Sequence, residues 1–367
     1  MALHRAYRVA VALAALLLLI NQQRRRHGPI APPPTAAPRP QALVAAPAAA
    51  PTAAALRSAP RGSDGLAVIV ASDEALLPGV VGLVRSARAL ASKALHFHLL
   101  TMDSAGTARV LACFGVANDS ATGVSIILVR RQWVDAVLAP RIRVEAAESI
   151  TGSLSSPLNF VRFFLPDLLP PHVGHGRVLY LDADIVVRGD VHALVAGAQL
   201  PRGIAVGAVP RREAHFRISR YQAKCSGLFA ERYPDRAFDP SAETFNAGVV
   251  VIDLAEWRRL GLSGEALWWM DRHAADVHGG LWHLGSQPIL HLMLHQRWHA
   301  LPPEWNLDGL GRVAHLRPDA LHAAQLLHWT GRRKPWRPDG LHTALFHRFV
   351  PREEVQHCWR VRPYTPL

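Results

Sequence analysis

Apolar and polar positions change their spacing several times along the folded region, which starts at Gly65. Short apolar runs typical of strands alternate with stretches of helical spacing: strands at 66–70, 94–100 and 124–129, and helices at 76–90 and 105–114. A further helix is predicted from Ser155 to about Leu169, because Pro157 suits a first helical turn. Strands that alternate with helices predict an α/β fold with a mostly parallel sheet and right-handed crossovers.

The next predicted strand contains the most informative residues of the chain. Residues 177–190 read Arg-Val-Leu-Tyr-Leu-Asp-Ala-Asp-Ile-Val-Val-Arg-Gly-Asp, so Asp182 and Asp184 interrupt an apolar run of the kind found in buried strands. Residues i and i+2 of an extended segment point to the same side, at the strand end where α/β sheets bind ligands. Two adjacent carboxylates suit a divalent cation that also holds a diphosphate. The structural alternative is a strand end with two solvated acids.

The pattern divides the chain into four parts. Residues 1–28 hold an apolar run of twelve residues between basic flanks, about 18 Å of helix against roughly 30 Å of bilayer core. We interpret it as a short uncleaved signal-anchor, with a cleaved signal peptide as the alternative. Residues 29–63 are Pro/Ala-rich and predict a disordered stem, 64–351 the folded domain and 352–367 a tail. Within the domain, 203–209 and 247–252 read as strands around a polar insertion at 211–242.

This organisation predicts a single-pass type II protein of the Golgi or endoplasmic reticulum membrane with a lumenal domain. Asn118 is a candidate glycosylation acceptor, and Cys113, Cys225 and Cys358 leave room for one disulfide in an oxidising compartment. The net charge of +13 comes from dispersed Arg and Lys, and no segment reads as a nucleic-acid-binding motif. We therefore expect no nucleic acid as a partner.

Three other positions have side chains suited to a binding site. Asp73 follows the first strand, where it could bind a base or a ribose, or simply cap the next helix. Arg162 lies in an apolar helix and needs an anionic partner, either a structural Asp or a phosphate. His328 follows a short apolar strand, and Gly331 and Lys334 beyond it suit a metal ligand beside a diphosphate.

A second metal hypothesis uses histidines spaced four residues apart. His291, His295 and His299 would share one face of a helix and could bind zinc. No Glu follows the first of them as a metalloprotease would require, so we favour a core or surface stripe.

Taken in order, these motifs resemble the retaining nucleotide-sugar glycosyltransferases of family 8, and above all the glycosyltransferase 8 domain-containing and galacturonosyltransferase-like members. The matching segments are Ala71-Ser72-Asp73, the helix with Arg162, Leu181-Asp182-Ala183-Asp184, Phe245-Asn246-Ala247-Gly248-Val249, Ser286-Gln287, and His328 with Gly331, Lys334, Pro335 and Trp336. They extend from about Gly65 to Pro351. Each motif alone is unspecific, whereas the ordered set is specific.

The resemblance implies a Rossmann-like nucleotide-binding domain of the GT-A type with a mixed C-terminal part that binds the acceptor. It also implies Mn²⁺, with Mg²⁺ as the alternative, a UDP-sugar donor, and a hydroxyl of a glycan or glycoconjugate as acceptor. The implied metal ligands are Asp182, Asp184 and His328. The implied donor-binding residues are Ala71, Asp73 at the uracil, Asp182, Ala183, Arg162 and Asn246 at the sugar, and Gly331 and Lys334 at the diphosphate.

Gln287 and Asp184 are the implied catalytic residues, Gln287 on the reactive face of the donor sugar. The family usually has an Asp before this Gln, and this chain has Ser286, so the donor stays open between a hexose and a hexuronic acid. Two alternatives remain. One is an inactive glycosyltransferase fold that binds sugars or acts as a scaffold. The other is a haloacid-dehalogenase-like phosphatase, whose Asp-x-Asp strand normally comes first in the chain.

Overall fold

The computed structural model describes residues 65–116, 123–142, 156–174, 176–211, 217–277, 280–282 and 285–359. The chain divides into two units, Met1–Arg61 and Gly62–Leu367, and all described residues belong to the second. The predicted signal-anchor, the stem and Asn118 lie outside the described residues. Within the described ranges, no helix combines the length and apolar character that a membrane span requires.

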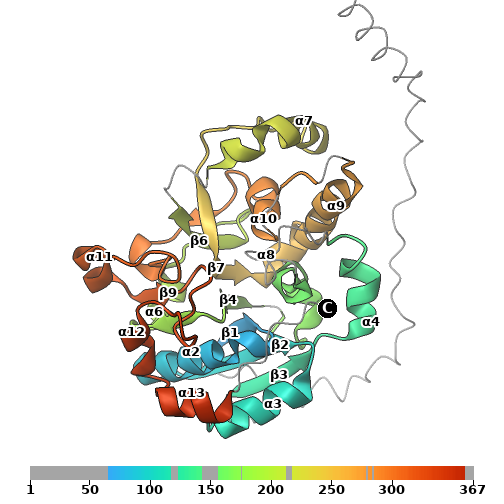
Figure 1. The fold of residues 1–367 in the computed structure, drawn as a ribbon. Helices are drawn as coiled ribbons and strands as arrows, with labels where there is room; N and C mark the ends of the chain where they lie inside the picture. Colours follow the sequence, from blue (N-terminus) through green and yellow to red (C-terminus); the bar gives the residue numbers. More distant parts are fainter. Residues whose placement is uncertain are drawn as a thin grey trace, which may run out of the picture. The chain divides into compact units, whose positions relative to one another are not determined.

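A seven-stranded sheet forms the centre of the domain, in the order β3-β2-β1-β4-β7-β6-β8. Its strands are β1 (Leu66–Ala71), β2 (Leu95–Thr101), β3 (Val124–Leu128), β4 (Arg177–Leu181), β6 (Val206–Arg211), β7 (Thr244–Asp253) and β8 (His299–Ala300). Strands β1 to β4 are parallel to one another and β8 is parallel to β6, whereas β7 is antiparallel to both β4 and β6. The predicted mostly parallel α/β fold is therefore confirmed (Figure 1).

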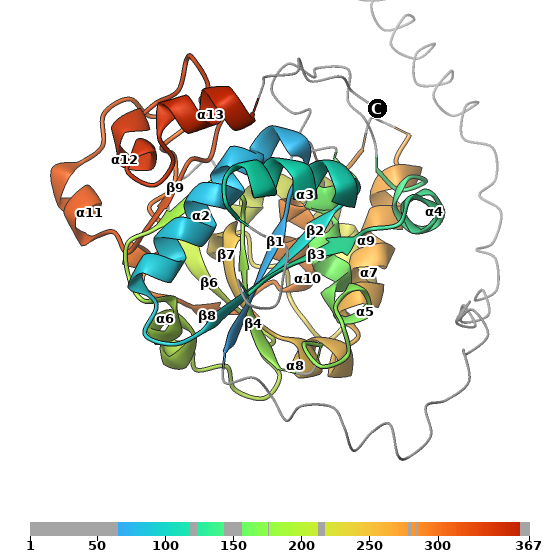
Figure 2. The ribbon, with the colours of Figure 1, turned by 90° about the horizontal axis from the view of Figure 1, so that it is seen from below.

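Helices cover both faces of this sheet. The α-helices of the described residues are α2 (Leu77–Leu90), α3 (Ser104–Cys113), α4 (Arg131–Trp133), α5 (Leu165–Leu168), α6 (Val191–Gly197), α7 (Gln222–Arg232), α8 (Leu254–Arg259), α9 (Leu262–Ala275), α10 (Gln287–Met293), α11 (Pro318–Ala323), α12 (Thr343–His347) and α13 (Arg352–Cys358). Figure 2 shows α2 and α3 over strands β1 to β3. The predicted polar insertion at 211–242 contains α7, whose Cys225 and Phe229 are buried.

Burial on both faces explains the continuous apolar runs. Along β4, Leu179 and Leu181 pack in one apolar cluster with α2 and α3, while Val178 and Tyr180 pack in a second cluster with α8, α9 and α10. Alternate residues of a strand point to opposite sides, so a strand covered on both faces is apolar at every position.

The segment predicted as one helix at 155–169 does not form a single regular α-helix. In its place the chain forms two short 3₁₀ turns, Pro157–Asn159 and Val161–Phe164, followed by the four-residue helix α5. Pro166 has no N–H to donate to the carbonyl of residue 162, which breaks the α-helical ladder. The carbonyl of Asn159 accepts a hydrogen bond from Arg162 Nε at 3.1 Å. Arg162 Nη1 also donates to the carbonyl of Ala247 in β7 at 2.7 Å, so the guanidinium faces the sheet.

The C-terminal segment packs on the domain and does not form a tail over its described length. Helix α13 places Val355 in the apolar cluster beneath α2, and Arg85 of α2 donates a hydrogen bond to Glu354 at 2.8 Å. A disulfide joins Cys113, the last residue of α3, to Cys358, the last residue of α13. Both views place α3 and α13 side by side (Figures 1 and 2).

Candidate functional site

The acid pair lies where two sheets meet. Asp182 follows β4, and its N–H donates to the carbonyl of Gly248 at 2.8 Å. After Asp184 the chain enters β5 (Ile185–Val187), which forms a separate two-stranded sheet with β9 (Leu326–His328). Because Ile185 pairs with His328 in that sheet, the register itself brings the imidazole next to the acid pair, across more than a hundred intervening residues.

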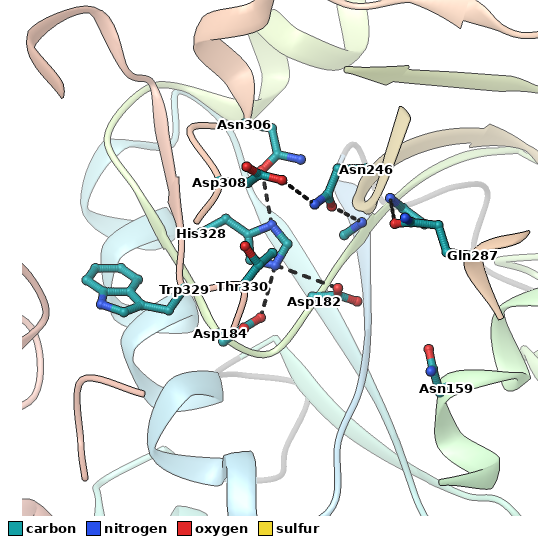
Figure 3. Close-up of polar contacts among 12 residues, drawn as sticks. Asn159, Asp182, Asp184, Asn246, Gln287, Asn306, Asp308, His328, Trp329 and Thr330 are labelled. Carbon is teal, nitrogen blue, oxygen red and sulfur yellow. Dashed lines mark hydrogen bonds and ion pairs between the residues drawn. The ribbon is translucent and has the colours of Figure 1, made fainter. Parts of the chain in front are cut away.

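The three predicted metal ligands form one cluster. His328 Nε2 lies 3.2 Å from Asp184 Oδ1 and 3.7 Å from Asp182 Oδ2 (Figure 3). One ligand atom from each residue can be chosen so that all three lie within 4.8 Å of one another. Two carboxylates and an imidazole are a donor set that suits Mn²⁺, and three protein ligands leave positions for a diphosphate. The residues therefore fit the implied metal.

Two cationic side chains, Lys334 and Arg162, lie beside the acid pair, Lys334 at Asp184 and Arg162 at Asp182. Lys334 Nζ donates to Asp184 Oδ2 and, at 2.8 Å, to the carbonyl of Trp329. Burial alone would raise the pKa of Asp184, but the positive charge of Lys334 outweighs burial and holds that pKa well below its usual range. Asp184 is therefore a carboxylate, as a metal ligand must be.

Arg162 makes the corresponding contact with the other acid. Its Nη2 lies 3.1 Å from Asp182 Oδ1, its Nη1 donates to the carbonyl of Ala247 at 2.7 Å, and its guanidinium carbon lies 4.6 Å from the centre of the Tyr180 ring. Of the two anionic partners that the sequence left open, the structure supplies the Asp. A planar guanidinium that binds a carboxylate, a carbonyl and an aromatic face is rigidly placed.

Gly248 allows this close approach. A Cβ atom at Gly248 would lie 2.6 Å from Asp182 Oδ2 and closer still to His328 Cε1. Any larger residue at position 248 would therefore displace Asp182 and His328, two of the three predicted metal ligands.

Two of the predicted sugar-side residues, Asn246 and Gln287, lie in β7 and at the start of α10. Asn246 Oδ1 accepts from the N–H of Gly248 at 2.8 Å, and Gln287 Oε1 accepts from the N–H of Ala247 at 3.2 Å. Ser286 Oγ donates to Asn159 Oδ1 at 2.8 Å. The serine in place of the family's Asp is therefore part of a hydrogen-bonded chain that continues through Asn159 to Arg162.

The remaining predicted residues lie around the same strand ends. Ala71 ends β1, and Asp73 caps the following turn by accepting from the N–H of Ala75 at 3.1 Å, the structural role that the sequence allowed. The carbonyl of Ala183 approaches Gly79 of α2 too closely for a Cβ there. Gly331 has φ of +112°, a conformation that glycine adopts without strain.

Two further residues, Asp308 and Asn306, contact the predicted site residues and were not predicted from the sequence. Asp308 Oδ2 accepts from Asn246 Nδ2 at 2.8 Å and from Arg211 Nε at 2.9 Å, so it holds the amide of Asn246 in place. Asn306 Oδ1 lies 3.0 Å from His328 Nδ1. Both residues lie in the irregular segment between β8 and β9. Its sequence has no periodicity that would mark them, and their proximity to His328 and Asn246 arises only in the folded chain.

The three histidines spaced four residues apart do not form a metal site among the described residues. For His291 and His295 the structure agrees with the alternative that they belong to the core. Helix α10 ends at Met293, so His299 lies in β8 and does not share a face with the other two. His291 Nε2 donates to the carbonyl of Phe245 at 2.8 Å, and His295 Nε2 accepts from the N–H of Asp239 at 3.0 Å. Both are buried.

His291 predicts a loss of stability in acid. Burial lowers its pKa to about 4, and Arg211 contributes in the same direction. An unfolded His binds a proton near pH 6.5, so between these values the unfolded state holds the extra proton. We expect the free energy of unfolding to fall by roughly 3 kcal/mol as the pH falls through this window. Chemical denaturation across the window measures it. His291→Gln should flatten the slope, exposed His322→Gln should not, and an unchanged slope in His291→Gln would contradict the assignment.

The sequence and the fold match one family. Residues 67–340 match the family model described as Glycosyl transferase family 8. Human glycosyltransferase 8 domain-containing protein 1 is 27% identical over 280 residues, which cover 72% of each chain. Glycosyltransferase 8 domain-containing protein 2 of Macaca fascicularis is 31% identical over 215 residues, which cover 53% of this chain and 57% of that protein. The chain thus spans little more than half the length of the latter relative.

Solved structures agree with the GT-A fold. The crystal structure of galactosyltransferase LgtC with donor and acceptor sugar analogues has a TM-score of 0.55 at 18% identity and covers 81% of this chain and 98% of its own. The apo structure of the bifunctional glycosyltransferase WbbM has a TM-score of 0.56 at 18% identity and covers 82% of this chain and 52% of its own. Strand β4 with the acid pair comes fourth in the chain, unlike the first strand of a phosphatase. The chain belongs to glycosyl transferase family 8.

Proposed function

We propose that the protein transfers a hexose or hexuronic acid from a UDP-sugar to a hydroxyl of a glycan or glycoconjugate, with retention of anomeric configuration and dependence on Mn²⁺. The observation that carries the proposal is the cluster of Asp182, Asp184 and His328 with Lys334 beside it. The cluster follows the carboxyl end of β4, and α/β sheets generally bind their ligands outside the carboxyl ends of the strands.

Each part of the cluster has a role in this reaction. Asp182, Asp184 and His328 would hold the metal, which when bound supplies positive charge to the diphosphate. Lys334 would add a donor to the same leaving group, and Gly331 allows the backbone to approach it closely. In the transfer, the bond from the anomeric carbon to the phosphate oxygen breaks and a bond to the acceptor oxygen forms on the same face. The departing phosphate oxygen takes the acceptor proton, so no strong protein base is required.

A screen of UDP-sugars for hydrolysis and transfer tests the proposal. We expect release of UDP from at least one donor with Mn²⁺ and its loss on chelation. Release that is insensitive to chelation would argue against the metal, and no release from any donor would argue against the activity.

A second candidate function, a sugar-binding module without catalysis, rests on Ser286 in place of the family's Asp. The same screen separates the two. A non-catalytic module would bind a UDP-sugar in calorimetry and leave it intact.

We also propose that the domain lies in the lumen of the Golgi or endoplasmic reticulum. The Cys113–Cys358 disulfide supports an oxidising compartment, and the apolar run near the N-terminus supports an anchor. Protease digestion of sealed microsomes is expected to spare the domain until detergent is added. Digestion without detergent would contradict a lumenal domain.

A further inference from the structure

The imidazole of His328 has a different partner on each of its two nitrogens. Nε2 faces the two carboxylates, and Nδ1 lies 3.0 Å from the amide oxygen of Asn306 (Figure 3). His328 is 1% exposed and Asn306 is 8% exposed, so water does not compete for this contact. An amide oxygen only accepts hydrogen bonds, which requires the proton of a neutral ring to be on Nδ1.

We propose that Asn306 is a positioning residue that fixes the tautomer of His328, so that Nε2 keeps its lone pair for a divalent metal. This inference rests on the proposed function for the identity of the metal. A ring with its proton on Nε2 would instead donate it to Asp184 and could not bind a metal through that nitrogen. In metal sites the hydrogen bond made by the other nitrogen sets which tautomer is present.

A second observation concerns the other end of the same amide. Asn306 Nδ2 is a buried donor without a hydrogen-bond partner in the part of the chain that the structure describes. Leaving a buried donor unpaired costs stability, and an apolar residue of similar shape avoids that cost. Folding alone therefore does not account for an asparagine here, whereas a need for its oxygen does.

The backbone holds the amide at this distance. The N–H of His328 donates to the carbonyl of Leu307 at 2.9 Å, and the N–H of Leu307 donates to the carbonyl of Leu326 at 3.0 Å. Residue 307 is thus paired to β9, and Asn306 directly precedes it. The amide consequently belongs to a rigid element, as a residue that orients a ligand should.

Calorimetric titration with Mn²⁺ is the first test. Asn306→Leu removes the acceptor and is expected to weaken Mn²⁺ binding roughly 10–100-fold. Asn306→Asp restores an acceptor and should bind within about threefold of wild type. Ser125→Ala is the matched control, because Ser125 Oγ is the 2.8 Å partner of Nδ1 of another buried histidine, His98. It should leave Mn²⁺ binding unchanged. Equal affinity in Asn306→Leu and wild type would overturn the proposal.

Nitrogen-15 NMR of the metal-free protein, above neutral pH, is the second test and does not depend on metal binding. We expect the proton of His328 on Nδ1 in wild type and a shift of population toward Nε2 in Asn306→Leu. A wild-type proton on Nε2 would overturn the inference, since the amide would then be turned the other way. If wild type binds no Mn²⁺ but carries its proton on Nδ1, the proposed metal dependence fails and control of the tautomer by Asn306 stands.

Discussion

Asp184→Asn is expected to lower glycosyl transfer by roughly a thousandfold, which corresponds to about 4 kcal/mol of transition-state stabilisation. The amide has nearly the same shape as the carboxylate but no charge. It would therefore lose attraction for both the metal and Lys334, whose side chain is only 16% exposed. The nucleotide should also lose the Mn²⁺ dependence of its binding, because metal and diphosphate complete each other's coordination. Initial rates and calorimetry of UDP with and without Mn²⁺ measure these effects.

Asp190→Asn is the matched control for this change. Asp190 caps α6 by accepting from the N–H of His192 at 3.0 Å, a contact that an amide oxygen can keep. Its activity should stay close to wild type, and thermal unfolding of both variants separates a lost site from a lost fold. A folded Asp184→Asn protein that keeps more than about a tenth of the activity would remove Asp184 from the metal site.

Gln287→Ala is expected to lower kcat by about 100–1000-fold with little change in donor KM. The side chain is oriented by its hydrogen bond from the N–H of Ala247, and the carbonyl of the next residue, Gly248, accepts from the N–H of Asp182. A polar group on the reactive face of the sugar should act mainly as the glycosidic bond breaks, so its loss should affect the transition state more than the bound donor. Steady-state kinetics over donor concentration measure both constants.

Gln325→Ala provides the comparison, since Gln325 is a half-buried amide whose side chain donates one long hydrogen bond, 3.4 Å to the carbonyl of Ala323. It should leave kcat unchanged. A rise in KM with unchanged kcat in Gln287→Ala would instead assign that residue to ground-state binding of the donor.

The sequence predicted the parts of the fold and site that depend on local pattern. Strands buried on both faces are continuous apolar runs, so the polar residues that interrupt them, Asp182 and Asp184, stand out. His328 could be assigned to the same site only through the family resemblance. Its actual position depends on the pairing of β5 with β9, and long-range pairing of two three-residue strands leaves no local signal.

The remaining differences have local physical causes that apolar spacing does not reveal. Pro166 breaks a segment whose apolar spacing otherwise reads as one helix. Helix α13 buries only Val355 within its seven residues, so its sequence looks like a polar tail. Three cysteines allow three pairings, and composition cannot choose among them. Asn306 and Asp308 act through side-chain contacts in an irregular segment, which periodicity does not detect.

The disulfide turns most of the domain into a covalent ring. Cys113 and Cys358 are 245 positions apart, so the whole chain from β3 to the end of α13 is closed on itself. Asp182, Asp184 and His328 all lie within the ring, whereas Asp73 lies outside it. A single backbone cut in any loop between the two cysteines would therefore release no fragment. The cut protein would migrate as one species until a reductant is added, and only then would it separate into two pieces. The position of the cut would decide whether the acid pair and the imidazole of His328 stay on the same piece.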